Sequence, residues 1–562
     1  MTGIPGLDRR AMEAERLARM AAKLPTNPET VTNTTQATTT TKRQRSISPS
    51  PTSRTAKKVK EQSEGSPSLQ FPHGTVKRTW AFGQSRSTND IKIEEVLEKS
   101  TLRTALLSAF QWDTNWIMAK LDLQQTKVIM VMQAENDAIK QQYRQETEYL
   151  GKILRLVFPS MEGNVNCMHS KLMLLFHPHK LRVVVPSANL VPYDWGEGGV
   201  MENSVFLIDL PRLEQTKGCD DDILKGVLNF DFSNTKDLAF VHSVGASAHY
   251  GEDMERTGYV GLSKAVRELH SSPQSSLPSL SNLHVDYAAS SIGSLNDGFL
   301  TIMHNAARGE DATAVPLTTT GPAPKPFQDT ISTTRIRDLF RVYYPLHATV
   351  TNSKSGSAGT ICLKSDWWKG PTFPRQCFRD YRSKRAGVLS HNKILYARGV
   401  NDKGQKIAWR YVGSANLSES AWGKLSWDRK NKEWKLGCKN WECGVILPVR
   451  FSRPLEDEQN TKPKMPEVVI LSDDDAETES EKEDASTDSE GETTSKKNDK
   501  KEDEKENKVQ SHNWKTLMTM SKTGAAKVEV PNMTVFGSED IPFEYPGAEY
   551  NGKDPWFINF GS

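Results

Sequence analysis

Residues 169–196 read HSKLMLLFHPHKLRVVVPSANLVPYDWG, and residues 391–423 read HNKILYARGVNDKGQKIAWRYVGSANLSESAWG. Both segments run in the same order: His-x-Lys, an apolar stretch, a turn, a second apolar stretch, Ser-Ala-Asn-Leu and a Trp-Gly pair. Agreement over so long a segment indicates an internal duplication. We therefore expect two similar halves in this chain.

The spacing within each segment places its polar residues together. Side chains of a strand alternate between its two faces, so the histidine and the lysine of each pair project to the same side. The asparagine ends the neighbouring strand and reaches the same rim. Halves packed about a pseudo-twofold axis then bring six polar side chains into one pocket: His169, Lys171, Asn189, His391, Lys393 and Asn416.

A glutamate precedes a further apolar strand in each half. MENSVFLIDL at 201–210 follows the first repeat, and NWECGVILPV at 440–449 follows the second. We expect Glu202 and Glu442 to accept the second ring N–H of each histidine, which fixes the tautomer and the ring orientation.

This set of side chains suits cleavage of a phosphodiester. Lysines and asparagines hold the non-bridging oxygens, where charge develops. One imidazole attacks phosphorus while the other protonates the leaving oxygen. The chemistry requires no metal and no other cofactor, and the sequence shows no carboxylate cluster to hold a metal. The symmetry of the repeat leaves open which histidine attacks.

Composition narrows the class of protein. Hydrophobic residues make up 36% of the 562 residues, below the usual globular share, so we expect unfolded segments beside the folded part. No apolar run is long enough to span a bilayer, and we expect no membrane partner. The six cysteines form no C-x-x-C pair, which favours free thiols in a reducing compartment.

Charge is distributed unevenly along the chain. The net charge is +3, but residues 455–512 carry −11 and residues 1–75 carry +6, which leaves +8 for the remainder. A folded part with this excess suits a polyanion. Two basic clusters near the N-terminus have the spacing of a bipartite import signal and predict a nuclear location. They consist of Lys42, Arg43 and Arg45, followed by Lys57, Lys58 and Lys60.

Strand-like and helix-like segments alternate from about residue 76, which predicts an α/β fold with covered sheets. We expect a disordered tail at 1–75, a first domain at 76–235 and a second at 236–562, interrupted by a disordered acidic insertion at 455–512. Within the first domain, residues 96–121 have helical periodicity and residues 127–133 read as a buried strand.

These motifs resemble the phospholipase D superfamily, whose members carry duplicated His-x-Lys motifs. Most members have an aspartate five residues after the lysine, where this chain has Phe176 and Arg398. The departure argues against the lipases and points to the branch that lacks this aspartate, and the chain resembles the tyrosyl-DNA phosphodiesterase family. Further matching segments are SSIGSL at 290–295, GSANLSESAWG at 413–423, WECGVIL at 441–447 and DPWFINF at 554–560. The resemblance implies two phospholipase D-like domains, each an α-β-α sandwich.

The resemblance also implies a role for each residue. His169 is the nucleophile that forms a phosphohistidine with a DNA 3′ end, and His391 is the general acid and then the base that activates water. The lysines and asparagines bind phosphate, with Glu202 and Glu442 behind the histidines. Ser291, Ser294 and Ser418 contact the DNA backbone. The substrate is a type IB topoisomerase peptide joined through tyrosine to a 3′-phosphate, on single-stranded, nicked or duplex ends, and the protein is expected to be a monomer.

Three other functions compete with this prediction. A phospholipase predicts a membrane-binding segment and the missing aspartate, and a vestigial DNA-end-binding protein predicts loss of at least one of the eight polar residues. The alternative that remains is a related nuclease acting on unmodified DNA or RNA ends. The basic, aromatic run at 365–385 leaves two interpretations open, because Trp367 or Trp368 either stacks on a base or belongs to the core.

One short motif lies in the acidic insertion. Val468–Leu471 are β-prone and are followed by Ser472 and three aspartates, Asp473–Asp475. Such a segment adds a strand to the sheet edge of a partner with a basic rim, as SUMO-interacting motifs do. We therefore expect SUMO binding at this segment.

Overall fold

A computed structural model describes residues 69–163, 165–215, 223–270, 282–311, 333–401, 404–451 and 529–558. Residues 1–68, with both basic clusters, lie outside this description, as do the acidic insertion and the segment expected to bind SUMO. The domain boundaries stay predictions. Within the described residues, no helix is both long and apolar enough to cross a membrane.

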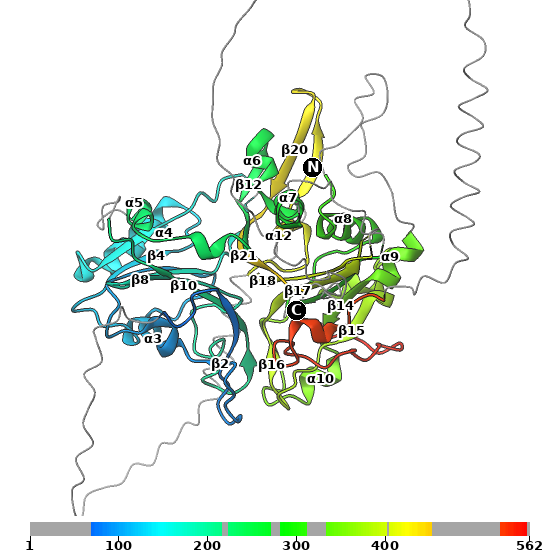
Figure 1. Ribbon diagram of the computed structural model, residues 1–562, viewed down its shortest axis with the longest axis horizontal. Helices are drawn as coiled ribbons and strands as arrows, with labels where there is room; N and C mark the ends of the chain where they lie inside the picture. Colours follow the sequence, from blue (N-terminus) through cyan, green and yellow to red (C-terminus); the bar gives the residue numbers. More distant parts are fainter. Residues whose placement is uncertain are drawn as a thin grey trace, which may run out of the picture. The chain divides into compact units, whose positions relative to one another are not determined.

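The first half of the chain builds a mixed sheet around a central antiparallel hairpin (Figure 1). Within the described residues the sheet has eight strands, in the order β2-β1-β10-β8-β7-β3-β4-β5. They are β1 (Thr75–Thr79), β2 (Asp90–Ile91), β3 (Thr104–Ser108), β4 (Lys127–Val131), β5 (Leu154–Val157), β7 (Leu172–Phe176), β8 (Lys180–Pro186) and β10 (Ser204–Pro211).

The second half repeats this plan. Its described strands run in the order β11-β21-β18-β17-β13-β14-β15. They are β11 (Ala239–Ser243), β13 (His284–Ala289), β14 (Phe340–Tyr344), β15 (Phe378–Asp380), β17 (Lys393–Val400), β18 (Lys406–Gly413) and β21 (Asn440–Pro448). A smaller sheet joins β12 (Ala246–His249), β20 (Glu433–Cys438) and β19 (Lys424–Asp428). The predicted α/β class with two similar halves is confirmed.

The strand registers show which residue of the first sheet corresponds to which residue of the second. Hairpin β7–β8 pairs Met173 with Val184, and hairpin β17–β18 pairs Leu395 with Tyr411. In both halves a parallel neighbour then follows, β3 beside β4 and β13 beside β14. The duplication seen in the sequence is therefore a duplication of the whole sheet.

Two short strands cross between the halves. β6 (Cys167–Met168) precedes the first His-x-Lys pair and runs parallel to β21 of the second sheet. β16 (Leu389–Ser390) precedes the second pair and runs parallel to β9 (Met201–Glu202) of the first half. Each histidine is thus anchored to the opposite half.

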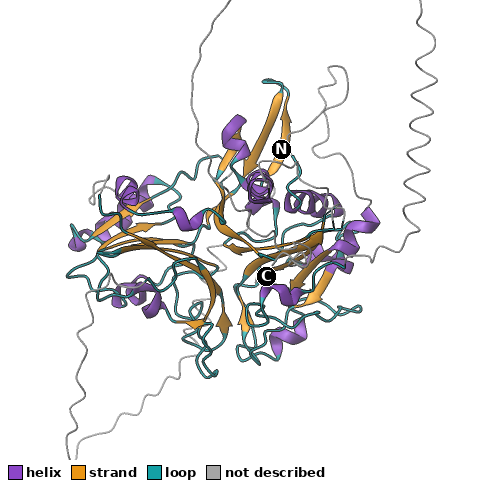
Figure 2. Ribbon diagram, in the orientation of Figure 1, coloured by secondary structure: helices purple, strands orange, loops and turns teal. Residues whose placement is uncertain are grey.

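Helices cover the sheets, as Figure 2 shows. In the second half α7 (Gly258–His270) and α8 (Asp297–Ala307) contribute to a core that includes Val266, Leu300, Leu395 and Trp409. The other described α-helices are α2 (Ile93–Leu97), α3 (Thr114–Ala119), α4 (Asp137–Glu146), α5 (Ile223–Gly226), α6 (Gly251–Glu255), α9 (Thr333–Leu339), α10 (His347–Thr351), α11 (Ser365–Lys369) and α12 (Glu419–Trp422).

One sequence prediction of secondary structure is wrong in part. Residues 96–121 have helical periodicity, but the structure places strand β3 between α2 and α3 there. Ala105 and Leu107 are fully buried in the first sheet, and a short apolar run of this kind fits a strand as well as a helix. The strand predicted at 127–133 is confirmed as β4.

The C-terminal segment 529–558 packs on the second half. Isolated bridges join Leu346 to Pro555 and Ser383 to Phe543. The hydroxyl of Tyr344 donates to the carbonyl of Trp556 at 2.8 Å. This segment therefore completes the second half on the side of β14 and β15.

Candidate active site

The main chain places the two histidines in matching positions. His169 lies between β6 and β7, and its N–H donates to Trp441 O at 3.0 Å. His391 lies between β16 and β17, and its N–H donates to Glu202 O, also at 3.0 Å. Each ring is therefore held where the two halves meet.

Both lysines are fully buried under their histidines. Lys171 Nζ donates to His169 O at 2.9 Å, and Lys393 Nζ donates to His391 O at 2.5 Å. Burial lowers the pKa of Lys171 and, together with the charge of Lys171, lowers the pKa of Lys393 well below its usual range. The two ammonium groups are thus close enough to repel each other, and an anion bound beside them would relieve that repulsion.

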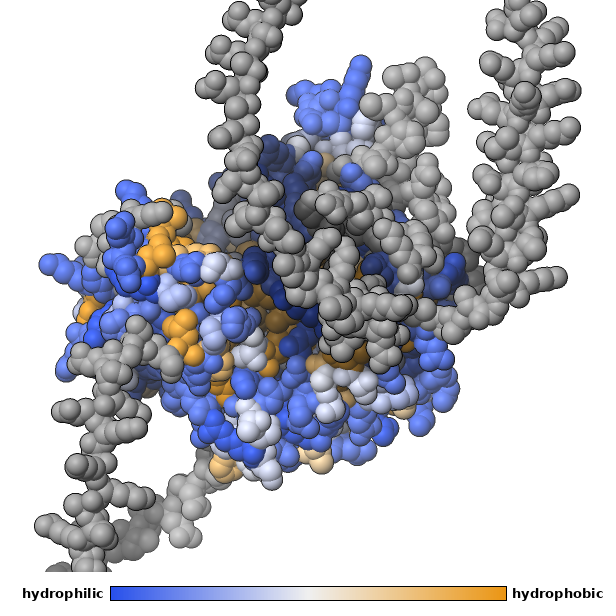
Figure 3. All heavy atoms as spheres, in the orientation of Figure 1, coloured by the Kyte–Doolittle hydropathy of each residue, from blue (hydrophilic) through white to orange (hydrophobic). Residues whose placement is uncertain are grey.

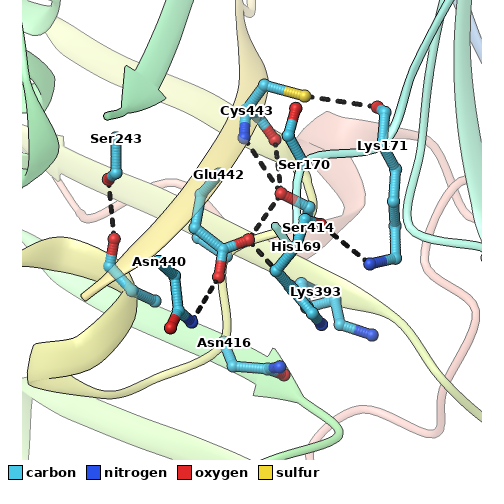
Figure 4. A network of polar contacts seen from close by, with 12 residues as sticks. His169, Ser170, Lys171, Ser243, Lys393, Ser414, Asn416, Asn440, Glu442 and Cys443 are labelled. Atoms are coloured by element: carbon cyan, nitrogen blue, oxygen red, sulfur yellow. Dashed lines mark hydrogen bonds and ion pairs between the residues drawn. The ribbon is translucent and has the colours of Figure 1, made fainter. Parts of the chain in front are cut away.

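Glu442 of the second half holds His169 of the first. His169 Nδ1 lies 2.8 Å from Glu442 Oε2, which also accepts from Ser414 Oγ at 2.6 Å (Figure 4). The other carboxylate oxygen accepts from Asn440 Nδ2 at 2.9 Å. Burial raises the pKa of Glu442 to about 7. The contact expected between Glu442 and a histidine is present.

Asp194 of the first half holds His391 of the second. His391 Nδ1 lies 3.1 Å from Asp194 Oδ2, which also accepts from the Asn189 N–H at 2.7 Å. Burial lowers the pKa of His391 to about 4, although Asp194 opposes the shift. Burial alone would raise the pKa of Asp194, but His391 and the Asn189 N–H outweigh it and the pKa is lowered. Asp194 therefore favours the protonated form of His391, whereas burial favours the neutral form.

Glu202 does not hold a histidine ring, contrary to the sequence prediction. Its carboxylate accepts from Ser383 Oγ at 2.6 Å and lies 3.3 Å from Arg385 Nη1, while burial raises its pKa. What reaches His391 is the Glu202 carbonyl, not its side chain.

Strand register explains this error. Gly413 pairs with Gly444 and Pro186 pairs with Val205, so Asn203 is the residue equivalent to Glu442. Asn203 accepts from Ser187 Oγ at 2.8 Å, as Glu442 accepts from Ser414. The sequence prediction therefore chose the residue one position before the true equivalent of Glu442.

The two asparagines are oriented by the same kind of contact. Asn189 Oδ1 accepts from the Gln111 N–H at 3.2 Å, and Asn416 Oδ1 accepts from the Ser291 N–H at 3.0 Å. Each carboxamide oxygen is thereby fixed, and Asn189 Nδ2 donates to Gln111 Oε1 at 3.4 Å. Gln111 Oε1 also accepts from Tyr193 Oη at 2.6 Å.

The serines expected to contact DNA gather in the second half. Ser291 and Ser418 are half-buried and Ser294 is exposed. Gly293 N donates to Leu417 O at 2.9 Å, which joins the segment of Ser291 and Ser294 to that of Ser418. Ser418 Oγ accepts from the Ala421 N–H as the N-cap of α12.

The tryptophans of the basic run belong to the core. Trp368 is 7% exposed and packs among Phe373, Phe378 and Tyr550, with ring centroids 5.2–5.5 Å away. Trp367 is half-buried against the same core, under Lys364. The core interpretation of Trp368 is therefore the right one.

Sequence comparison of the repeats missed three residues at the site. Asp194 and Gln111 have no counterpart of their own type in the second half, where Ala421 and Ser291 take their places. Phe110, whose ring centroid lies 5.5 Å from that of His169, is equivalent to Ser290. Among the described residues, no three His, Cys, Asp or Glu side chains are grouped to hold a metal ion.

The sequence profile of the tyrosyl-DNA phosphodiesterases matches residues 75–222 and 213–550. The chain belongs to the tyrosyl-DNA phosphodiesterase family. It is 26% identical over 414 residues to tyrosyl-DNA phosphodiesterase 1 of Arabidopsis thaliana, covering 64% of this chain and 59% of the relative. It is 24% identical over 334 residues to a probable tyrosyl-DNA phosphodiesterase of Caenorhabditis elegans, covering 54% and 68%.

Members of this family have solved structures. The crystal structure of the yeast tyrosyl-DNA phosphodiesterase aligns with a TM-score of 0.46 at 15% identity, covering 66% of this chain and 89% of the yeast chain. The chain spans just under three fifths of the length of the Arabidopsis member.

Proposed function

We propose that this protein is a DNA-repair phosphodiesterase that hydrolyses the bond between a tyrosine, or another adduct, and a DNA 3′-phosphate. The observation that carries the proposal is the pairing of each histidine with a carboxylate of the opposite half, above two buried lysines. Membership of the tyrosyl-DNA phosphodiesterase family supports the substrate class.

In the first step, His169 attacks phosphorus. The Nδ1–H of His169 donates a hydrogen bond to Glu442, so the proton stays on Nδ1 and the lone pair of Nε2 is free to attack the phosphorus atom. A bond forms between Nε2 and phosphorus while the bond from phosphorus to the tyrosine oxygen breaks. His391 enters this step protonated, a form that Asp194 and the charge of the bound phosphate favour. The departing oxygen takes this proton, and the DNA remains attached through a phosphohistidine.

In the second step, His391 acts as a base. It removes a proton from a water molecule, the resulting hydroxide attacks phosphorus, and the bond to His169 breaks. His391 has given up its proton in the first step, and burial, which lowers its pKa to about 4, favours this neutral form, the one that a base requires. The products are a free 3′-phosphate and the restored imidazole.

Charge on the phosphoryl oxygens is balanced by the chain itself. Lys171 and Lys393 supply positive charge when a bound phosphate offsets the lowering of their pKa values by burial. Asn189 and Asn416 supply amide N–H groups, and their carboxamide oxygens are held by the N–H groups of Gln111 and Ser291. Preorganised donors of this kind stabilise the transition state in a site that excludes water. The mechanism therefore runs without a metal or other cofactor.

A 3′-phosphotyrosyl oligonucleotide tests the proposal. The full chain should release tyrosine and leave a 3′-phosphate, and His169→Ala should release none. An oligonucleotide of the same sequence with a free 3′-hydroxyl is the matched control, because a nuclease for unmodified ends would shorten it. Faster cleavage of the control than of the tyrosyl substrate would overturn the proposal in favour of that nuclease.

We further propose that the protein acts in the nucleus and binds SUMO. The import signal consists of the two basic clusters at 42–45 and 57–60, and replacing the second cluster with alanines should leave a tagged protein in the cytoplasm. An NMR titration with SUMO should shift the signals of Val468–Leu471, and unchanged signals would reject that partner.

A further inference from the structure

Hairpin β19–β20 is joined at both ends to the candidate site. Its first strand begins shortly after Ser418, and its second strand ends shortly before Glu442. Figure 1 shows the hairpin, in yellow, projecting from the second half. The catalytic steps above assign no role to it.

The hairpin is strongly basic for its length. Residues 424–439 contain six lysines and arginines against two acidic residues. Arg429, Lys430 and Lys432 are exposed at the tip, and Lys424 and Lys439 are exposed at the base. Figure 3 shows hydrophilic atoms over this projection. A run of exposed cations beside a site for DNA is the usual footprint of phosphate contacts.

Internal contacts hold the hairpin in one shape. Asp428 accepts from Tyr250 Oη at 2.8 Å and from Lys435 Nζ at 3.0 Å, and it also caps the turn through the Lys430 N–H. On the apolar face Trp427 and Trp434 meet edge to face, with centroids 5.3 Å apart. Asp428 is therefore occupied by these contacts, while the other acidic residue, Glu433, is exposed at the tip together with the three cations.

The hairpin lies on the side of the site where DNA is expected. The Gly293 N–H bonds to Leu417 O, and a Cβ atom added at Gly293 would lie 2.7 Å from Ser418 Cβ. The serines proposed to hold the DNA backbone are thus packed against the segment that leads into β19.

We propose that the tip of hairpin β19–β20 binds the sugar-phosphate backbone of the DNA several base pairs from the 3′ end, an inference that rests on the proposed function. A five-residue strand spans about 17 Å, which corresponds to about five base pairs of duplex. The contact is to phosphates and carries no sequence preference. It favours ends with an adjoining duplex over short single-stranded fragments.

Binding measured against substrate length tests this inference. The full chain and the variant Arg429→Gln/Lys430→Gln/Lys432→Gln are titrated with a 3′-phosphate duplex of about fifteen base pairs and with a fragment of about three nucleotides. The matched control removes three exposed cations from the first half, as Lys99→Gln/Lys152→Gln/Arg155→Gln. The hairpin variant should bind the duplex at least about tenfold more weakly, with a salt slope shallower by about 2–3.

The same variant should bind the short fragment as the natural protein does and release tyrosine at the same rate from a 3′-phosphotyrosyl form of that fragment, and the control should match the natural protein on both ligands. Equal weakening on both lengths, unchanged duplex binding, or equal weakening in the control would overturn the inference. These outcomes are distinct from failure of the proposed function, which is shown by a natural protein that binds the duplex yet releases no tyrosine.

Discussion

Asp194 and His391 lie 197 positions apart and in different halves, yet their side chains meet at 3.1 Å. The carboxylate is fully buried and is fixed by the N–H of Asn189, so the imidazole has a rigid partner. Glu442 and His169 form the reciprocal contact at 2.8 Å, although Glu442 and Asp194 do not occupy equivalent positions in the two halves. Each half therefore supplies the group that orients the histidine of the other, and neither half forms a complete site alone.

Replacing Asp194 with asparagine should impair His391. The amide oxygen of asparagine can still accept both contacts, but it carries no negative charge and so no longer favours the protonated form of the His391 ring. We expect hydrolysis of the phosphohistidine to slow by about 10²–10⁴-fold, the range for general acid–base catalysis. Single-turnover assays with a 3′-phosphotyrosyl oligonucleotide measure this as accumulation of a covalent protein–DNA species.

Glu202→Gln is the control for that variant. The amide retains an acceptor for Ser383 Oγ, and the Glu202 carbonyl that binds the His391 N–H is unchanged. Turnover should therefore stay much closer to that of the natural protein. Equal losses in the two variants would contradict the assignment of Asp194 as the partner of His391.

The pH dependence of the first step should reflect the ionisation of the Glu442 carboxyl group. Its pKa is raised to about 7, so the carboxylate is protonated below that pH and ionised above it. The ionised form is the better acceptor for the His169 Nδ1–H, so adduct formation should slow as the pH falls through 7. Rapid-quench measurements between pH 5 and 9 should show this limb, and Glu442→Gln should lower the rate and flatten the limb. A limb that persists in this variant belongs to another group.

Activity should survive removal of divalent metals. Lys171 and Lys393 lie fully buried beneath the two histidines and provide the positive charge that a metal supplies in other phosphodiesterases. Full turnover in excess EDTA, unchanged by added magnesium or zinc, is the expected result. Loss of turnover that a metal restores would require a different mechanism.

The sequence predicted those features of the site that both halves share. Repetition revealed the histidines, lysines and asparagines, and the Glu442 carboxylate followed from its place ahead of a strand. Asp194 was not predicted because its counterpart in the second half is Ala421. Comparison of the two repeats finds only residues that are the same in both halves. Glu202 was chosen because sequence alone does not show strand register, and a shift of one residue reverses the face of a strand.

The two chemical steps make different demands on the two histidines. In the first step the leaving group is a phenolate, whose conjugate acid has a pKa of about 10, so it departs with little help from an acid. In the second step water must attack phosphorus, and water is a poor nucleophile unless a base removes its proton.

Loss of the His391 imidazole should therefore slow the second step more than the first. His391→Ala should accumulate a covalent protein–DNA species on denaturing gels, whereas His169→Ala should form none. A 3′-alkyl phosphodiester should restore the dependence of the first step on His391, because an alkoxide needs a proton to leave. If His169→Ala yields the trapped species and His391→Ala does not, then the roles of the two histidines are the reverse of those proposed.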